Sequence, residues 1–215
     1  MRKKLFFILL AILCCNGLFA QYEYDDSTVL DDHAYRVSFG PKIGLGLALG
    51  SHSDVQDLSF SPSLCYQGGI AINAHFGRRF EMSEGGTGWL GLQLEALYGA
   101  NRLKLGSEGF GVNCIEVPFL AQLYVTPTLA VEAGATMVKM LGGTPHEFTA
   151  EGATYALSEL KGNDVMPTFG LCYKNPSGLM LDARFNLGMS PLAGNFDTKV
   201  SSFVVSFAYL FNIVK

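Results

Sequence analysis

The stretch NCIEVPFLAQLY, residues 113–124, alternates apolar and polar side chains with a period of two. Val117 and Phe119 fall on one side, whereas Glu116 falls on the other. This alternation is typical of a β-strand whose two faces meet different environments. Pro118 shares the side of Glu116 and has no N–H to donate to a neighbouring strand, so we expect a bulge or weakened pairing there.

The same alternation recurs along the chain from residue 35 to residue 211. It is clearest in YRVSFGPKIGLGLAL, residues 35–49, and in LMLDARFNLGMS, residues 179–190. Six further segments follow it, at 64–76, 89–102, 113–125, 129–141, 165–174 and 200–211. Strands of this length exceed the ~5–6 residues common in soluble sheets. No helical period of comparable length competes, so the pattern predicts an all-β fold of eight strands.

The connections between these segments differ in length. Residues 126–128 and 175–178 are short and contain proline, which indicates tight turns. The other connections are longer, at 50–63, 103–112, 142–164 and 191–199, and 77–88 is a long exception on the short side. Short turns at one end and long loops at the other are typical of an outer-membrane barrel.

The composition of the polar face decides which side faces outward. It is rich in small residues: Gly44, Gly46, Ala48, Gly69, Ala71, Gly91, Gly99, Gly134, Gly170 and Gly188. In a soluble lipocalin-like barrel this face would meet solvent, where glycine lowers the stability of a strand because it loses more backbone entropy on folding. A narrow lumen does accommodate small side chains. The sequence therefore predicts an eight-stranded antiparallel up-and-down transmembrane β-barrel, with Glu116 and Gln122 facing the lumen and the bulky apolar side facing lipid.

The N-terminal residues carry the signs of export. Residues 1–20 begin with Arg2, Lys3 and Lys4, continue with an apolar core and end in small and polar residues, which predicts a signal peptide cleaved near Ala20. Residues 21–34 hold five acids and no base, which indicates an acidic periplasmic lead-in before a barrel over 35–215. Such a chain is expected to contact outer-membrane lipid and the barrel-assembly machinery.

Composition excludes several other classes of function. The chain is 49% hydrophobic and only 16% charged. Without residues 1–20 it has 12 basic and 19 acidic residues, a net charge of −7, and no basic block, so nucleic acid is not an expected partner. The remaining cysteines, Cys65, Cys114 and Cys172, are odd in number and have no zinc-ligand spacing. We therefore expect no disulfide framework, no metal and no cofactor.

Several of these segments resemble the PorT-like family of small outer-membrane β-barrels. The resemblance rests on IEVPFL at 115–120, followed by EAG at 132–134, with LDARF at 181–185 and FAYLF at 207–211 as the last two strands. Cys114 departs from the family pattern, which often has an aromatic residue two places before the glutamate. The resemblance implies an outer-membrane location and an association with protein secretion, which is the role of one member.

Charged residues on the lumen face form the candidate site. Lys42 and Arg184 are expected near mid-depth on one side, across from Glu95 and Glu116. The full expected lumen network also includes three flanking residues, Asp182, Glu132 and Arg36. Such a cluster serves either a selective channel or a plug of ion pairs, and the plug is favoured because buried charges persist chiefly when paired.

Two remaining patterns bear on activity. Three histidines, His33, His52 and His146, lie outside the expected strands, and His75 lies on a lumen face. An outer-leaflet lipid enzyme is therefore the third candidate function, after a binding barrel and a channel. The aromatic residues Trp89, Phe76 and Tyr98 suit the membrane interface. We expect no catalysis, and a structural or binding role through the loops at 50–63 and 142–164.

Overall fold

The computed structural model describes most of the segment expected to form the barrel. The described residues are 35–52, 60–79, 88–105, 108–126, 128–144, 147–150, 153–156, 162–190 and 198–214. The expected signal peptide and acidic lead-in, His33, His146 and much of the expected functional loops lie outside them. No helix in the described part of the chain is long and apolar enough to cross a membrane.

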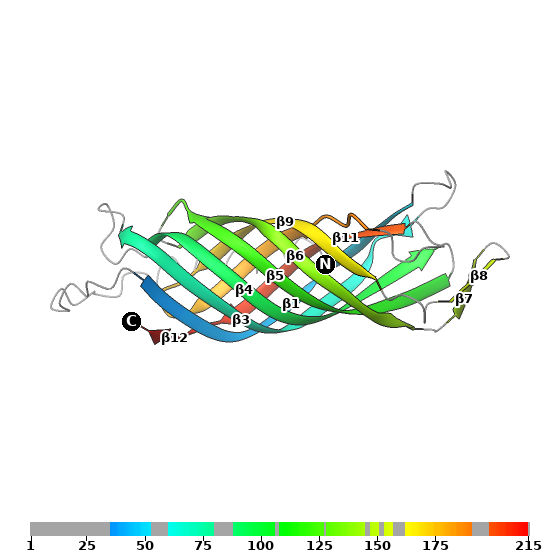
Figure 1. The fold of residues 1–215 in the computed structure, drawn as a ribbon, viewed down its shortest axis with the longest axis horizontal. Helices are drawn as coiled ribbons and strands as arrows, with labels where there is room; N and C mark the ends of the chain where they lie inside the picture. The colour runs from blue at the N-terminus through cyan, green and yellow to red at the C-terminus, as the bar shows by residue number, and fades with distance from the viewer. Residues whose placement is uncertain are drawn as a thin grey trace, which may run out of the picture. The chain divides into compact units, whose positions relative to one another are not determined.

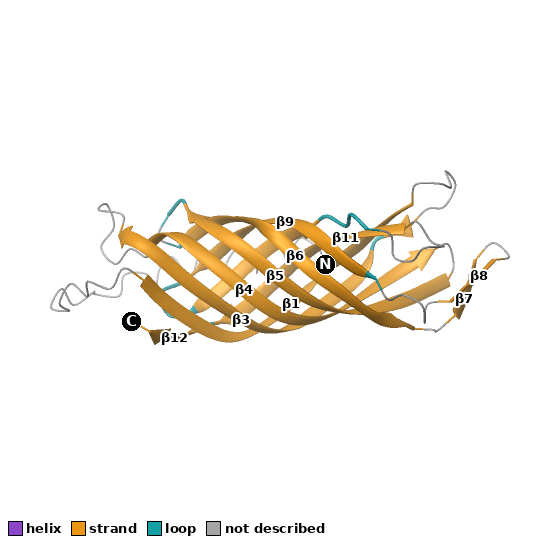
Figure 2. Cartoon of the chain, viewed as in Figure 1, coloured by secondary structure: helices purple, strands orange, loops and turns teal. Residues whose placement is uncertain are grey.

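Eight long antiparallel strands form a closed wall in the described residues (Figure 1, Figure 2). They are β1 (Tyr35–His52), β3 (Ser63–Arg79), β4 (Gly88–Leu105), β5 (Glu108–Tyr124), β6 (Leu129–Thr144), β9 (Asn163–Lys174), β10 (Leu179–Asn186) and β11 (Thr198–Tyr209). Each neighbours the next in this order, and β11 pairs with β1 to close the ring. The wall therefore has the predicted eight-stranded up-and-down topology.

The strands are staggered as well as paired. Following in-register partners from Ala48 on β1 through β11 and round the wall leads back to β1 at Ser38, ten residues earlier. A stagger of this kind requires the strands to tilt against the barrel axis, as Figure 1 shows. Two residues that are paired in the strand register therefore lie at different depths along the barrel axis.

The short elements lie at the ends of the wall. They are β2 (Phe60–Ser61), which pairs with β4, the separate hairpin of β7 (Glu147–Ala150) and β8 (Ala153–Ala156), and β12 (Phe211–Val214). The expected last strand is divided at Leu210, whose side chain is buried and whose N–H bonds to Gly178 O at 2.7 Å. After this break β12 continues beside the first residues of β1.

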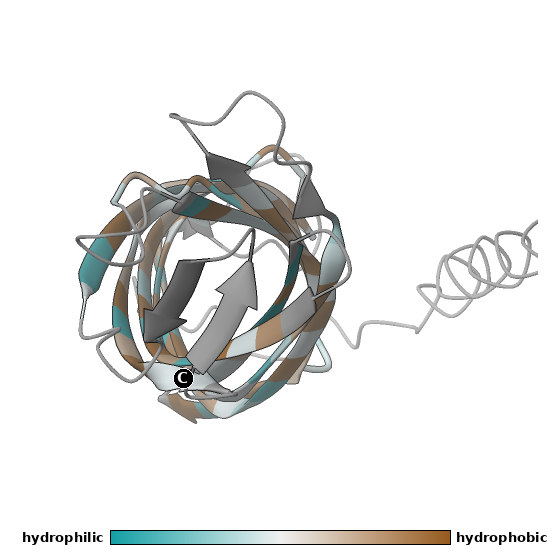
Figure 3. Cartoon of the chain, turned by 90° about the vertical axis from the view of Figure 1, so that its right-hand side faces the viewer, coloured by the Kyte–Doolittle hydropathy of each residue, from teal (hydrophilic) through white to brown (hydrophobic). Residues whose placement is uncertain are grey.

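The two faces of the wall differ as the alternation predicts. On β1, Leu45 is 63% exposed and Ile43 is 65% exposed, whereas Ser38 and Lys42, on the other face of the same strand, are buried. Figure 3, a view turned by 90°, shows the hydrophobic and hydrophilic positions alternating along the strands around the ring. Apolar side chains thus form the outer surface, as contact with lipid requires.

Pro118 weakens strand pairing without a bulge. The pairing of β4 with β5 runs to Leu94 opposite Phe119 and resumes at Leu97 opposite Glu116 in the same register. Val117 and Pro118, the two β5 positions between them, are not paired with β4, whereas Pro118 remains paired with Thr136 on β6. The register shift between β5 and β6 lies instead at Asn113 and Cys114, where Leu141 on β6 is the extra residue, so weakened pairing was the correct alternative at Pro118.

Candidate functional site

Lys42 lies at the centre of a buried ion cluster near the middle of β1. Its Nζ atom is 2.8 Å from Glu95 Oε1 on β4 and donates a hydrogen bond to it. The same atom is 2.7 Å from Asp182 Oδ2 on β10, an ion pair that lacks the alignment of a hydrogen bond. All three side chains are fully shielded from solvent. Lys42 thus connects carboxylates from two different strands.

Arg184 completes the cluster from β10. Its Nη1 donates to Glu95 Oε1 at 2.8 Å, and its Nε and Nη2 donate to the two oxygens of Glu132 on β6. Its Nε also lies 3.2 Å from Asp182 Oδ1. A guanidinium suits this position because its planar fork serves several carboxylate oxygens at once.

The cluster brings together two cations and three carboxylates. They are Lys42, Arg184, Glu95, Glu132 and Asp182, all among the expected network residues. Buried charges of this kind are costly to desolvate and depend on their partners. The excess of one carboxylate makes each cation more critical than any single acid.

Two expected members lie elsewhere. Among the described residues, Glu116 forms no ion pair, and it accepts a hydrogen bond from Cys114 Sγ at 3.3 Å. The stagger of the wall places Glu116 nearer the loop end than Glu95, so the expectation that both lie at one depth was wrong. Arg36 is half-buried at the turn end, beside His75 and Lys174 in a small pocket.

Lys174 anchors a polar network that sequence reasoning missed. Its Nζ contacts Ser38 Oγ at 3.0 Å, Asn73 Oδ1 at 2.8 Å and His75 Nε2 at 3.2 Å. His75 Nε2 in turn lies 2.9 Å from Tyr124 Oη. The same parity that placed Gly170 on the lumen face would have found Lys174 at the end of its strand.

Neutral amides connect this network to the ion cluster. Asn73 Nδ2 donates to Gln93 Oε1 at 2.9 Å and to Gln122 Oε1 at 2.8 Å. Gln122 Nε2 donates to Glu132 Oε2 at 3.1 Å, and Gln93 Nε2 donates to Glu95 Oε1. A continuous hydrogen-bonded path therefore runs from Lys174 to the ion cluster, and it holds these lumen side chains in place.

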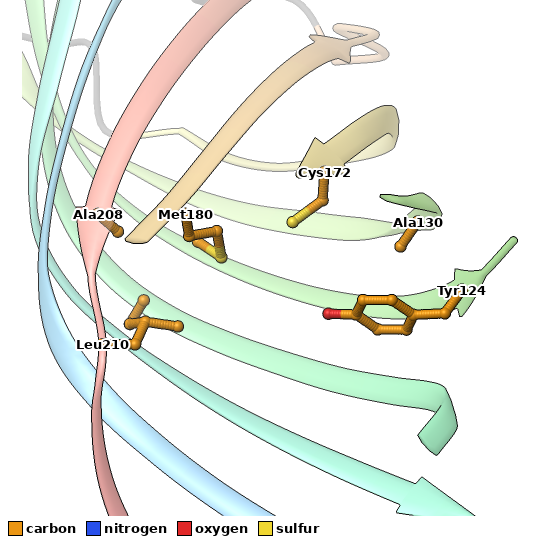
Figure 4. Packing of buried hydrophobic residues seen from close by; sticks show 7 residues of the cluster. Tyr124, Ala130, Cys172, Met180, Ala208 and Leu210 are labelled. Atoms are coloured by element: carbon orange, nitrogen blue, oxygen red, sulfur yellow. The ribbon is translucent and has the colours of Figure 1, made fainter. Parts of the chain in front are cut away.

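Apolar side chains fill the lumen beside these polar groups. Figure 4 shows them projecting from several strands toward one another near the turn end. The cluster comprises Ala71, Tyr124, Ala130, Cys172, Met180, Ala208 and Leu210. A second buried group, Cys114, Val138 and Met166, lies on the loop side of the ion cluster. Packed side chains thus occupy the lumen on both sides of the charges.

In the described part of the chain, the three cysteines and His75 are reactive side chains that lie buried outside the ion cluster. Cys65, Cys114 and Cys172 are free and buried. Within the described residues, no group of three or more His, Cys, Asp or Glu side chains is arranged to hold a metal ion. His75 is committed to Tyr124 and Lys174 inside the wall.

These features define an eight-stranded antiparallel transmembrane β-barrel with an occupied lumen. Among solved structures, the chain is similar to Neisserial surface protein A, with 13% identity, 81% of this chain and 99% of that chain covered, and a TM-score of 0.54. It is also similar to Ail, the attachment invasion locus protein of Yersinia pestis, with 12% identity, 81% and 98% covered, and a TM-score of 0.43. At such identities the likeness concerns the fold.

Sequence comparison adds no family. No protein-family model matches the chain, and no curated protein matches it significantly. The PorT-like resemblance therefore stays a prediction.

Proposed function

We propose that this protein is a non-conducting outer-membrane barrel with a structural or binding role at its extracellular end. The observation that carries the proposal is the lumen, where Lys42 and Arg184 pair with three buried carboxylates between two groups of packed side chains. A water-filled pore needs charges that solvent reaches. The shielding of these side chains favours the plug over the channel.

Conductance in planar lipid bilayers tests this proposal. The folded protein is expected to produce no discrete conductance steps, and Asp182→Asn serves as a variant that alters cluster charge with little change of shape. Regular steps whose ion selectivity shifts in Asp182→Asn would establish the alternative, a narrow channel for small solutes. Silent bilayers with verified insertion support the plug.

The proposed role involves no catalysis. An outer-leaflet lipid enzyme needs its histidine where a lipid can reach it, whereas His75 is buried and bonded to Tyr124 and Lys174. His52 and His146 are not described at side-chain level, so the test is chemical. Overexpression is expected to leave the mass spectrum of lipid A unchanged, and a new lipid A species would support the enzyme.

An association with protein secretion is part of the proposal on the PorT-like resemblance alone. Crosslinking in the intact cell, followed by purification of the folded barrel, tests it. Co-purification of components of one secretion machine is the expected result. Recovery of the barrel-assembly machinery alone would remove the secretion link and leave the barrel proposal intact.

A further inference from the structure

Exposed charges on the described wall have a single sign. The exposed charged side chains are Arg102, Lys104, Lys139 and Lys199. The acids whose side chains are described are all buried, namely Glu95, Glu116, Glu132, Asp164 and Asp182.

These basic side chains all lie toward the loop end of the barrel. Arg102 and Lys104 are near the end of β4, which starts beside the turn that joins β5 to β6. Lys139 lies in the second half of β6, and Lys199 is the second residue of β11, which starts at the loop end. The positive charges therefore lie in the half of the barrel that faces the headgroups of the outer leaflet in the proposed orientation.

Arg102 and Lys104 line a groove of about 440 Å³ on this rim. The other lining residues are Tyr66, Ala100, Leu103, Phe110, Gly111 and Asn113. The groove lies where pairing along β4 is interrupted, because Asn101 pairs with Cys65 on β3 whereas Lys104 pairs with Ser61 on β2, one residue out of register. The irregular strand pairing thus produces a hollow beside two cations.

The chemistry of the groove points to an amphiphilic anion. Two cationic side chains and the Asn113 amide offer donors to phosphate oxygens. Tyr66 is exposed at the groove, and Tyr98, which is also exposed, extends this surface toward the middle of the wall. A ligand with a charged head and apolar chains would contact both surfaces at once.

We propose that this groove binds the phosphate group of an outer-leaflet lipid through Arg102 and Lys104. The lipid's acyl chains lie along the apolar wall below it. The identity of the lipid rests on the proposed outer-membrane location. The binding itself is measured on purified protein, so its failure can be told apart from a failure of the conductance test.

Native mass spectrometry of the folded full chain in detergent tests this site. The probes are bisphosphorylated lipid A, the same lipid with its phosphates removed, and inorganic phosphate as a soluble competitor. The test variant is Arg102→Gln with Lys104→Gln. The matched control is Lys139→Gln with Lys199→Gln, which removes two exposed charges from the same end but outside the groove.

The wild type and the control are expected to bind bisphosphorylated lipid A equally, and the test variant about tenfold or more weakly, because two charge-assisted contacts are lost. Dephosphorylated lipid A is expected to bind as weakly as the test variant does. Equal binding of both lipids, or equal loss in both double variants, would overturn the site. Displacement by inorganic phosphate at matched concentration would assign the groove to a free anion and overturn the lipid.

Discussion

Arg184 Nη1 and Glu95 Oε1 lie 2.8 Å apart although their strands, β10 and β4, stand four places from each other in either direction round the eight-stranded wall. This ion pair therefore spans the lumen. Glu132, on a third strand, bonds to the same guanidinium. This contact between opposite sides of the barrel crosses the lumen and ties the wall together.

The first prediction tests the role of Arg184 in stability. Arg184→Met leaves three buried carboxylates with Lys42 as their one cation in the cluster. We expect the free energy of unfolding to fall by about 3–5 kcal/mol, as when one partner of a buried pair is removed. Urea unfolding in detergent, followed by the fluorescence of Trp89, the chain's single tryptophan, measures it.

The matched control is Asp182→Asn, which keeps the side-chain shape and leaves two cations with two carboxylates. Its loss of stability is expected to be clearly smaller. Adding Glu132→Gln to Arg184→Met should recover part of the loss, because contacting sites are not additive. Equal losses in the two single variants would show that charge balance does not govern the cluster.

The second prediction concerns the outer face at Leu45. Leu45→Arg places a charge against lipid and is expected to cost about 2–4 kcal/mol near the midplane. The folded fraction, read as the faster band of unheated protein on an SDS gel, should fall, and less protein should fractionate with the outer membrane. Leu45→Ala keeps the face apolar and should fold nearly normally. A fully folded Leu45→Arg would mean that this face does not meet lipid.

The third prediction concerns the free thiols. Cys65, Cys114 and Cys172 are buried in the lumen, so a polar maleimide should not reach them in the folded barrel. In the barrel without residues 1–20, which hold Cys14 and Cys15, mass spectrometry is expected to find no label before boiling in SDS and three labels after it. Rapid labelling of the folded protein would indicate a water-filled lumen instead of a packed one.

Much of the fold follows from local pattern. Because lipid and lumen impose opposite polarity on successive residues, the alternation at Val117 and Phe119 identified the strand, and the small residues of the polar face then assigned that face to the lumen. The same reasoning found Lys42, Glu95 and Arg184. These predictions succeed because a period of two is a property of the strand itself.

The depth of a side chain in the lumen, and the partners of its hydrogen bonds, were not predictable in the same way. The depth of Glu116 depends on the stagger accumulated across many strand pairs, which no single segment encodes. Parity and strand direction therefore grouped Glu116 with Glu95. The hydrogen bonds of Lys174 join side chains of three strands, its own β9, β1 with Ser38 and β3 with Asn73. Neutral amides such as Gln93 carry no charge that would single them out in the sequence.

The glycines of the lumen face occur for two different reasons, and composition indicated only the first of them, a narrow lumen. A narrow lumen explains Gly44, where an added Cβ would meet side-chain atoms, Ser206 Oγ at 2.7 Å and Gln67 Cγ at 2.9 Å. At Gly46 the added Cβ would lie 2.0 Å from the backbone oxygen of Phe203 on the paired strand. Close approach of two backbones, not lumen width, requires this glycine.

The last prediction separates these two causes. Gly46→Ala is expected to lower the free energy of unfolding by about 1–3 kcal/mol, because the strand must shift to relieve the clash. Gly44→Ala should cost clearly less, since its added Cβ meets only side-chain atoms, of Ser206, Gln67 and Val204, which shift more easily than backbone, and alanine offsets about 0.5–1 kcal/mol through lower chain entropy. Gly44→Leu, which the lumen has no room for, should again destabilise. The urea midpoint of Trp89 fluorescence compares the three variants under one condition. If Gly44→Ala proves as harmful as Gly46→Ala, lumen volume alone governs both sites and the backbone explanation fails.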